Sequence, residues 1–400
     1  MENSHIIPLL KEITRTAREV GPDTNVKEVV DIFQKDPSLL ALMVTEQGRF
    51  IGIVGRKTLF FQHLGHVFAM ELYGRKPIRV LLDERHVVME PGLDINSALA
   101  RLLEVDPTLS TDSFPVITGD RCLGIVSVSD LLMKISENQA QLLETLHSLS
   151  ARIREEVAKA SKIQQDLLPP PEFQFGGVTI SAEVITSSEI GGDFYDYFCI
   201  GDDRLGLVVA DVSGHGVQSG MVTTAAKASL HTLISQGINT PAALLHGMNS
   251  AILTTARQTL LMTCLIALID LRKGELTLAN AGHNFPYLYR KETRAVEMLK
   301  DVSGYPLGFE EDNRYEEVTT PFNRGDSLFL YTDGVVECMN REEEEFGYDR
   351  LEAFLQGHLN SPPDTAKRLL LETVVRFTGT ASFEDDVTLL IATSHAEQSS

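Results

Sequence analysis

The chain has 400 residues, of which 43% are hydrophobic and 23% are charged, and its formal net charge at pH 7 is −21. This length favours two domains, and this composition is typical of a globular protein rather than a disordered one. An acidic field of this size repels nucleic acid and anionic membrane, so we expect neither as a partner.

The cysteines and the hydropathy pattern bear on location. The four cysteines lie far apart and none forms a CxxC pair, which favours reduced thiols in a cytosolic protein. The N-terminus has no cationic-then-apolar leader pattern, and the longest apolar stretch, 260–269, is too short to span a bilayer. We therefore expect a cytoplasmic location.

Residues 1–135 contain an internal repeat. The sequence Asp-Pro-Ser-Leu at 36–39 recurs as Asp-Pro-Thr-Leu at 106–109, each time after a short amphipathic helix pattern. Each copy continues as strand, turn and strand, and the second strand ends in Gly-Ile-Val, at 52–54 and 124–126. A repeated helix–strand–strand–helix unit predicts a module that stacks in pairs.

Residues 136–170 predict a helical linker. No Gly or Pro interrupts 136–168, and the prolines at 169–171 end the helix. A 3-4 spacing follows the helix at Leu142, Leu146, Leu149, Ile153, Glu156, Ala160, Ile163 and Leu167. This pattern favours a coiled coil and hence a homodimer, with Glu156 as its flaw. The alternative is an amphipathic helix that packs on its own chain.

Residues 171–395 predict a domain of the α+β class. Strand patterns occur at 178–184, 205–210, 263–270, 275–280, 327–331 and 387–392, and helix patterns at 218–236, 241–255 and 365–376. Neighbouring strands joined by short turns imply antiparallel sheets, with the helices on the outside.

Two acidic residues are expected to meet at the open end of a hairpin. The turn Gly201-Asp202-Asp203 lies midway between Asp193 and Asp211. A hairpin with that centre places the two carboxylates side by side. This arrangement is costly unless a cation sits between them.

A second acidic pair follows the same logic. Asp333 ends the strand 327–331, and Asp385 and Asp386 precede the strand 387–392, so the acids converge if these strands are antiparallel. Oxygen-only ligands suit Mg²⁺ or Mn²⁺, and two such ions can activate a water for attack on a phosphoryl group. Taken singly, Asp333-Gly334 could be a turn and Asp385-Asp386 a solvated loop.

Seven motifs in order give the C-terminal region a family resemblance. They are Ile163–Pro169 (IQQDLLP), Gly191–Asp196 (GGDFYD), Asp211–Gly216 (DVSGHG), Asn280–Asn284 (NAGHN), Gly304–Gly308 (GYPLG), Tyr331–Gly334 (YTDG) and Asp385–Thr388 (DDVT). The region resembles the stage II sporulation protein E-like branch of the metal-dependent, protein phosphatase 2C-like (PPM superfamily) serine/threonine phosphatases. The resemblance implies a two-sheet antiparallel β-sandwich flanked by helices.

The resemblance also implies a two-metal site. Its expected ligands for two Mn²⁺ or Mg²⁺ ions are Asp193, Asp211, Asp333 and Asp385, with the carbonyl of Val212 and, ranked lower, Asp386. Many relatives carry a phosphate-binding Arg that is absent between residues 180 and 196 here, so the metals must hold the phosphate largely alone. His215 and His283 could each donate a proton to the leaving seryl oxygen or only hydrogen-bond a loop.

The N-terminal repeat resembles a tandem CBS pair (a Bateman module), which in many proteins binds adenine nucleotides. By this resemblance, Ser127 would donate to a phosphate and Asp130 would accept from ribose hydroxyls. In the first copy Gly55 and Thr58 replace these residues, although Arg56 and Lys57 could help to hold phosphate. The alternative is a pair that serves dimerisation alone.

The resemblances together predict an enzyme that dephosphorylates a phosphoserine or phosphothreonine on a regulatory protein. By family, that substrate would be an anti-sigma factor antagonist of STAS fold, and the CBS pair and the linker helix would regulate the activity. The alternative is a catalytically silent scaffold whose phosphatase-like domain only binds its partner, in a nucleotide-dependent way.

Overall fold

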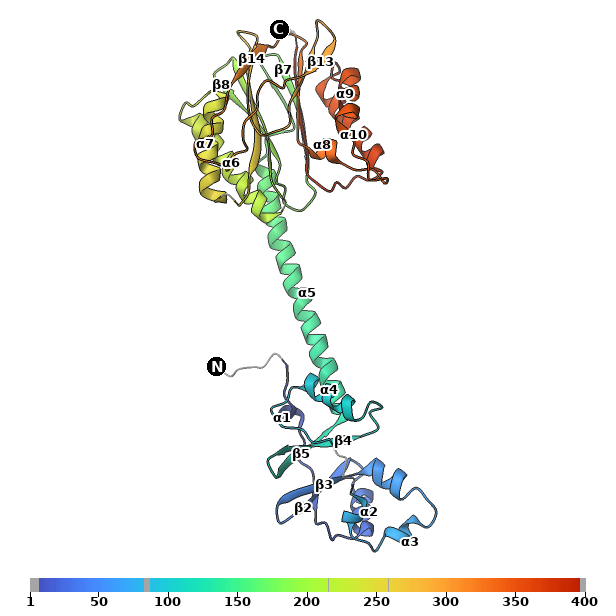
Figure 1. Ribbon diagram of the computed structural model, residues 1–400. Helices are drawn as coiled ribbons and strands as arrows, with labels where there is room; N and C mark the ends of the chain where they lie inside the picture. The colour runs from blue at the N-terminus through green and yellow to red at the C-terminus, as the bar shows by residue number, and fades with distance from the viewer. Residues whose placement is uncertain (1–6, 83–86, 215, 258, 396–400) are drawn as a thin grey trace. The chain divides into compact units, whose positions relative to one another are not determined.

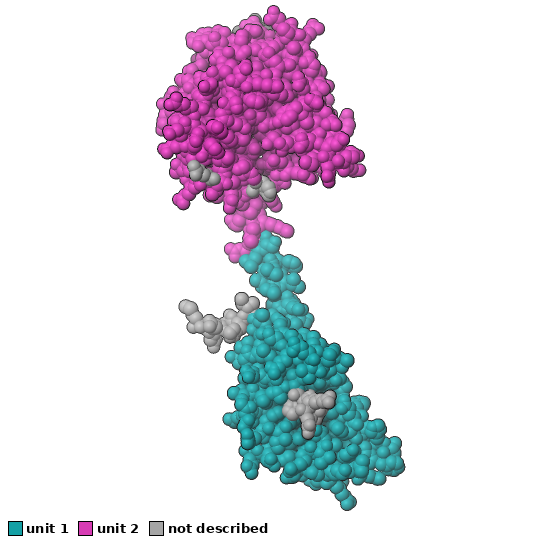
Figure 2. Space-filling view, viewed as in Figure 1, with its two compact units in different colours: residues 1–151 teal, residues 152–400 magenta. Residues whose placement is uncertain are grey.

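The computed structural model describes residues 7–82, 87–214, 216–257 and 259–395. The chain divides into two compact units, residues 1–151 and 152–400, which are coloured separately in Figure 2. Each unit has hydrophobic clusters of its own.

The first unit contains the two copies of the repeat. The first copy has α2 (Val26–Lys35), β2 (Ala41–Glu46) and β3 (Arg49–Gly55), and the second has α4 (Ile95–Val105), β4 (Ser113–Thr118) and β5 (Arg121–Ser127). Both hairpins are antiparallel, and both shift register at the equivalent point, between Val44 and Thr45 and between Val116 and Ile117. The shared irregularity supports the internal repeat.

Short elements complete this unit: α1 (Leu10–Ile13), β1 (Glu19–Val20), the π-helix η1 (Thr58–His63), α3 (Ala69–Tyr73) and the 3-10 helix η2 (Ile78–Leu81). The segment before β1 crosses between the copies. Arg15 bridges to Ile125 of the second copy, whereas β1 pairs in parallel with β2 of the first. The two copies are therefore joined through the chain that precedes the first one.

The helix α5 spans Val128–Leu167 and is longer than the sequence pattern suggested. It starts eight residues before Ser136, because β5 ends at Ser127 and leads directly into the helix. Its apolar stripe at Leu142, Leu146, Leu149, Ile153, Ile163 and Leu167 is between 41% and 64% exposed. The stripe is therefore not buried against its own chain. No helix in the described ranges, α5 included, has both the length and the apolar character needed to cross a membrane.

The second unit is a sandwich of two antiparallel sheets. The five-stranded sheet has the order β14 (Val318–Pro321), β11 (Glu275–Ala281), β10 (Met262–Asp270), β9 (Arg204–Val212) and β8 (Phe194–Ile200). The six-stranded sheet has the order β13 (Ala295–Met298), β12 (Tyr287–Arg290), β15 (Ser327–Tyr331), β16 (Val387–Ser394), β7 (Val178–Ile185) and β6 (Glu172–Phe175).

Helices cover both outer faces of this sandwich (Figure 1). α6 (Val217–Ser235) and α7 (Pro241–Ala256) pack on the five-stranded sheet, and α8 (Gly334–Glu337), α9 (Gly347–His358) and α10 (Pro363–Thr378) pack on the six-stranded sheet. Strand β9 shows why both faces are apolar. Leu205, Leu207 and Val209 lie in the core between the sheets, whereas the alternate residues Val208 and Ala210 face the helices. The predicted α+β sandwich is confirmed.

Candidate metal centre

The β8–β9 hairpin brings the first acidic pair together as its spacing predicted. Phe194 pairs with Ala210 in the antiparallel ladder, so Asp193 and Asp211 occupy the next opposed positions at its open end. Asp193 is buried, and its carboxylate accepts a hydrogen bond of 2.7 Å from Thr332 Oγ1. Because Thr332 follows β15, this bond connects the first acid to the other sheet.

The second pair lies at the matching end of the six-stranded sheet. β15 and β16 are antiparallel, with Tyr331 opposite Leu389. Thr332 N donates to Thr388 O at 3.0 Å, and Thr388 N donates to Thr332 Oγ1 at 2.9 Å. Asp333 follows the end of β15, and Asp385 precedes the start of β16. Each sheet therefore supplies two of the four predicted ligands.

The four carboxylates repel one another. Burial, followed by the charge of Asp211, raises the pKa of Asp193 well above its usual range. Burial, followed by the charge of Asp333, raises the pKa of Asp211 to about 7. Burial and Asp385 likewise raise the pKa of Asp333. The cluster favours added positive charge, from protons or from cations.

The four aspartates are suitable ligands for divalent ions, but their carboxylates do not converge closely enough to form a coordination sphere. In the part of the chain that the structure describes, no group of three or more His, Cys, Asp or Glu side chains has the geometry to hold a metal ion. The donors are all oxygens, as Mg²⁺ and Mn²⁺ prefer, and their mutual repulsion is what such ions would relieve. The Val212 carbonyl faces the same loop, since a Cβ added at Gly192 would lie 2.8 Å from its oxygen.

Asp386, the lower-ranked candidate ligand, accepts hydrogen bonds at both carboxylate oxygens. Its Oδ1 accepts from the Ser187 amide at 2.7 Å and from Ser187 Oγ at 3.0 Å. Its Oδ2 accepts from the amide of Gly192 at 2.6 Å and from that of Asp193 at 3.3 Å. With both oxygens engaged, this carboxylate holds the loop that carries Asp193, and we do not retain it as a metal ligand.

Of the two candidate histidines, His283 is among the described residues. His215 lies outside the described residues. His283 is buried, its Nδ1 lies 2.7 Å from Thr263 Oγ1, and its backbone is bonded in both directions to the Asn280 side chain. Burial lowers the pKa of His283 to about 4, so the ring is neutral near pH 7. A neutral imidazole is a weak acid, and the geometry favours support of the loop over proton donation.

A cleft of about 690 Å³ opens beside the acids. It is lined by Asp211, Asp333 and Asp385 together with Ser213, Gly214, Glu337 and neighbouring residues, and no Lys or Arg is among the described residues that line it. A phosphoryl group in this cleft would find no Lys or Arg among the lining residues that the structure describes. Among the described lining residues, bound cations would be the natural source of positive charge, in line with the lack of an Arg between residues 180 and 196.

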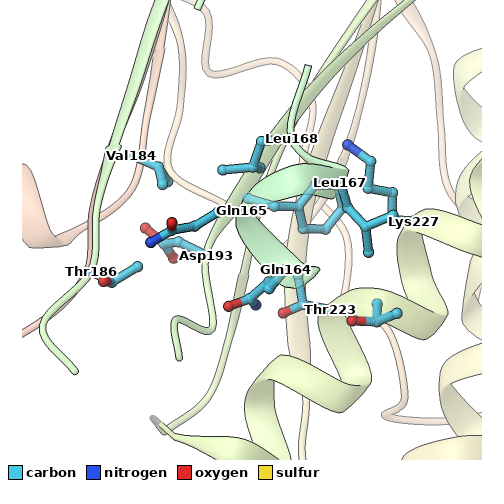
Figure 3. Close-up of a pocket in the computed structure, with 11 residues that line it drawn as sticks. Gln164, Gln165, Leu167, Leu168, Val184, Thr186, Asp193, Thr223 and Lys227 are labelled. Atoms are coloured by element: carbon cyan, nitrogen blue, oxygen red, sulfur yellow. The ribbon is translucent and has the colours of Figure 1, made fainter. Parts of the chain in front are cut away.

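Two supporting residues were not recognised as functional from the sequence. Gln164, on the last turn of α5, donates from Nε2 to Gly191 O at 2.7 Å and accepts from the Gly191 amide at 3.2 Å. Thr223, on α6, donates to Gly192 O at 2.7 Å. Both line a pocket of about 150 Å³ with Asp193 (Figure 3). No spacing rule connects them to the acids, because the contact depends on tertiary packing.

In the first unit, the predicted nucleotide-binding residues are engaged locally. Ser127 is buried, its hydroxyl lies 2.6 Å from Ser129 Oγ, and it accepts from the Asp130 amide at 3.1 Å. The Asp130 carboxylate pairs with Arg15 at 2.9 Å, beside a cleft of about 290 Å³ that both residues line with Lys134. A ribose would therefore compete with Arg15 for Asp130.

The first copy is less suited to phosphate than its basic residues suggested. Arg56 donates to the carbonyls of Leu39, Phe33 and Asp36 and so closes the end of α2. Lys57 pairs with Asp112 at 3.2 Å. Gly55 and Thr58 line a cavity of about 120 Å³, but the neighbouring cations are already used.

Comparison with known proteins agrees with this geometry. Residues 201–395 match the family model for stage II sporulation protein E, and residues 10–62 match that for the CBS domain. The chain is similar to phosphoserine phosphatase RsbU of Bacillus subtilis, at 25% identity over 250 residues, which cover 62% of this chain and 72% of RsbU. It is also similar to phosphoserine phosphatase RsbP of the same organism, at 28% identity over 188 residues, 46% of each chain. This chain thus spans less than half of RsbP.

A solved structure shows the same fold. The SiaA-PP2C domain of Pseudomonas aeruginosa superimposes with a TM-score of 0.54 at 24% identity, over 62% of this chain and 99% of that domain. The antiparallel sandwich, the paired acids and the matched family models agree with one another. The chain therefore carries a stage II sporulation protein E-type phosphatase domain, matched at residues 201–395, and a CBS domain, matched at residues 10–62, and the relatives named phosphoserine phosphatase agree with a protein serine/threonine phosphatase.

Proposed function

We propose that this chain is a metal-dependent phosphatase that removes phosphate from serine or threonine of a regulatory protein. The observation that carries the proposal is the cluster of four carboxylates, two from each sheet, at a cleft whose described lining residues include no Lys or Arg. Two Mn²⁺ or Mg²⁺ ions held by Asp193, Asp211, Asp333, Asp385 and the Val212 carbonyl would supply positive charge and an activated water. Asp386 and Thr332 hold Asp193 in place within this proposed metal centre, Asp386 by accepting from its amide and Thr332 by donating to its carboxylate.

For the substrate we propose a STAS-type anti-sigma factor antagonist. The resemblance to the stage II sporulation protein E-like phosphatases supports this choice, as do relatives named phosphoserine phosphatase. No Arg lies between residues 180 and 196, where many relatives bind phosphate, so small phosphoesters should be poor substrates compared with a protein that makes further contacts. A cytoplasmic location is part of the same proposal.

For regulation we propose a homodimer in which the CBS pair acts through α5, with adenine nucleotide as the ligand. The exposed apolar stripe of α5 supports a coiled coil with a second copy. Glu156 lies in this stripe and pairs with Lys159 of its own helix at 3.0 Å. That pair partly offsets the repulsion expected between two copies of Glu156 across the seam. The cleft beside Asp130 supports a nucleotide site in the second repeat.

The deciding experiment is phosphate release from a phosphoserine protein, with and without Mn²⁺. We expect turnover that EDTA abolishes and that exceeds turnover of a small phosphoester. Binding of the phosphoprotein without Mn²⁺-dependent release would instead establish the alternative, a silent scaffold.

A further inference from the structure

The loop that follows β13 presents a stacked pair of aromatic residues to solvent. Tyr305 belongs to the Gly304–Gly308 motif, and Phe309 follows it directly. Their ring centroids are 5.0 Å apart and their planes are 15° apart. Tyr305 is 60% exposed and Phe309 is 45% exposed. Large aromatic side chains held in this way are typical anchors of protein interfaces.

Backbone hydrogen bonds connect this aromatic pair to the lining of the metal cleft. Leu307, between the two rings in sequence, exchanges hydrogen bonds of 2.8 and 3.0 Å with Met262 of β10. Met262 in turn is opposite Val212 of β9. The Ser213 amide donates to Leu261 O at 2.9 Å, and the Leu261 amide donates to Ser213 Oγ at 3.1 Å. Because Ser213 lines the cleft, only the start of β10 separates the segment that carries the rings from the cleft.

The base of this loop is fixed from inside the domain. Asn249 of α7 is buried, its Oδ1 accepts from the Gly308 amide at 2.8 Å, and its Nδ2 donates to Glu310 O at 2.8 Å. Asn313 donates from Nδ2 to Pro306 O at 3.3 Å. The rings therefore stand on an ordered loop, and a partner that covers them loses little free energy to ordering it.

A second apolar group follows the same part of the cleft lining. Helix α6 begins at Val217, shortly after Gly214, which lines the cleft. Val217 and Met221, one turn apart at the start of α6, are 50% and 69% exposed. Exposed apolar side chains thus occur on both segments that adjoin the 213–214 part of the cleft, which is the pattern of a binding surface rather than of isolated residues.

The charge beside the rings limits which partner fits. Glu310, Glu311 and Asp312 follow Phe309 directly, and all three are exposed. A complementary partner offers an apolar side chain to the rings and a Lys or Arg to the acids. A small phosphoester has neither, whereas the surface of a phosphoprotein around its phosphoserine can have both. Binding energy from such remote contacts is what lets an enzyme prefer a large substrate to a small one with the same reacting group.

We propose that Tyr305 and Phe309 form a docking surface for the phosphoprotein substrate. An apolar side chain near the phosphoserine packs on the ring pair, and a neighbouring Lys or Arg pairs with the acids at 310–312, while the phosphate enters the cleft. This inference rests on the proposed function and deepens it, since it states which surface recognises the protein part of the substrate. Small phosphoesters, which reach only the cleft, do not use this surface.

The test compares the double variant Tyr305→Ser, Phe309→Ser with Phe61→Ser in the full chain. Phe61 is a 77% exposed ring in the first unit, which makes it a matched control for the loss of exposed aromatic surface. With Mn²⁺ present, kcat/KM is measured on a serine-phosphorylated STAS-domain protein and on p-nitrophenyl phosphate. We expect the ratio of the two values to fall about 10–100-fold in the double variant, mainly through KM for the phosphoprotein, and to stay within about twofold in Phe61→Ser. Glu311→Lys should lower the same ratio, because it repels a basic segment of the substrate.

An unchanged ratio in a folded double variant would overturn the inference and leave the proposed function intact, and so would an equal loss on both substrates, which would indicate damage to the metal centre. Weaker dimerisation with an unchanged ratio would assign the surface to a second copy of the chain instead. An unchanged or higher ratio in Glu311→Lys would exclude the basic segment. If the double variant does not fold, Tyr305→Ser alone decides by the same ratio. An unmodified protein that releases phosphate from neither substrate would overturn the proposed function as well.

Discussion

Gly334 offers the sharpest test of how closely the acidic strand ends are packed. It follows Asp333 and begins α8, and a Cβ added there would overlap the carbonyl oxygen of Asp386 and lie 2.9 Å from its carbon. The obstacle is backbone at the start of β16, which cannot rotate away as a flexible side chain can. Gly334→Ala must therefore displace Asp386 and, with it, the loop that Asp386 holds.

The cost can be estimated from this overlap. Forcing an extra methyl group into a packed site typically destabilises a protein by about 1–3 kcal/mol. For a unit of this size, each kcal/mol lowers the unfolding temperature by about 2–4 °C, so we expect a fall of roughly 2–12 °C. A displacement of about 1 Å at a catalytic centre can cost about 100-fold in rate, so turnover should fall by more than stability suggests.

Gly357→Ala is the matched control. Gly357 lies within α9, and a Cβ there would meet nothing within 4 Å. Replacing an unhindered helical glycine by alanine should stabilise the protein by about 0.5–1 kcal/mol and leave turnover unchanged. Unfolding is followed by circular dichroism in EDTA, and activity by phosphate release with Mn²⁺. A Gly334→Ala protein with the unfolding temperature and turnover of the unmodified protein would refute the packing described for this site.

Three further substitutions test the other proposals. Asp211→Asn should abolish Mn²⁺-dependent turnover, because a shared ligand loses its charge. The metal-free variant should unfold at no lower temperature than the unmodified protein, because one repelling carboxylate is gone. Retention of more than about a hundredth of the rate would count against the two-metal role. Glu156→Leu should raise dimer affinity in analytical ultracentrifugation and make turnover insensitive to any ligand of the first unit. Unchanged dimerisation with an intact ligand response would exclude α5 as the transmitting element. Asp130→Ala should weaken adenine-nucleotide binding in calorimetry, and no binding even to the unmodified protein would favour the dimerisation-only alternative.

The sequence predicted those parts of the site that depend on strand register. A turn centred on residue 202 is enough to place Asp193 opposite Asp211, because side chains in a hairpin are paired by counting from the turn. The convergence of Asp333 with Asp385 required one assumption, that β15 and β16 are antiparallel neighbours, and this was correct.

The residues that hold the acids could not be predicted in this way. Asp386 bonds to Ser187 and Gly192, nearly two hundred residues earlier in the chain, and its neighbour Asp385 has the same residue type without those bonds. Gln164 reaches Gly191 only because α5 ends against the sandwich. Such contacts are set by how separate elements pack, and no local pattern records them. The first turns of α5 were missed for a related reason, since strand β5 runs into the helix without a break.

The division of the proposed ligands between two sheets has a consequence for the lifetime of the protein. Ions bound by Asp193 and Asp211 on one side and by Asp333 and Asp385 on the other would crosslink the two halves of the sandwich. Any opening that separates the sheets would release them, so metal would bind the closed state alone. At a free ion concentration of 100 times the dissociation constant, such binding adds about 2.7 kcal/mol of stability. This is a substantial part of the margin that keeps a typical domain folded, so metal supply would control the abundance of the protein as well as its rate.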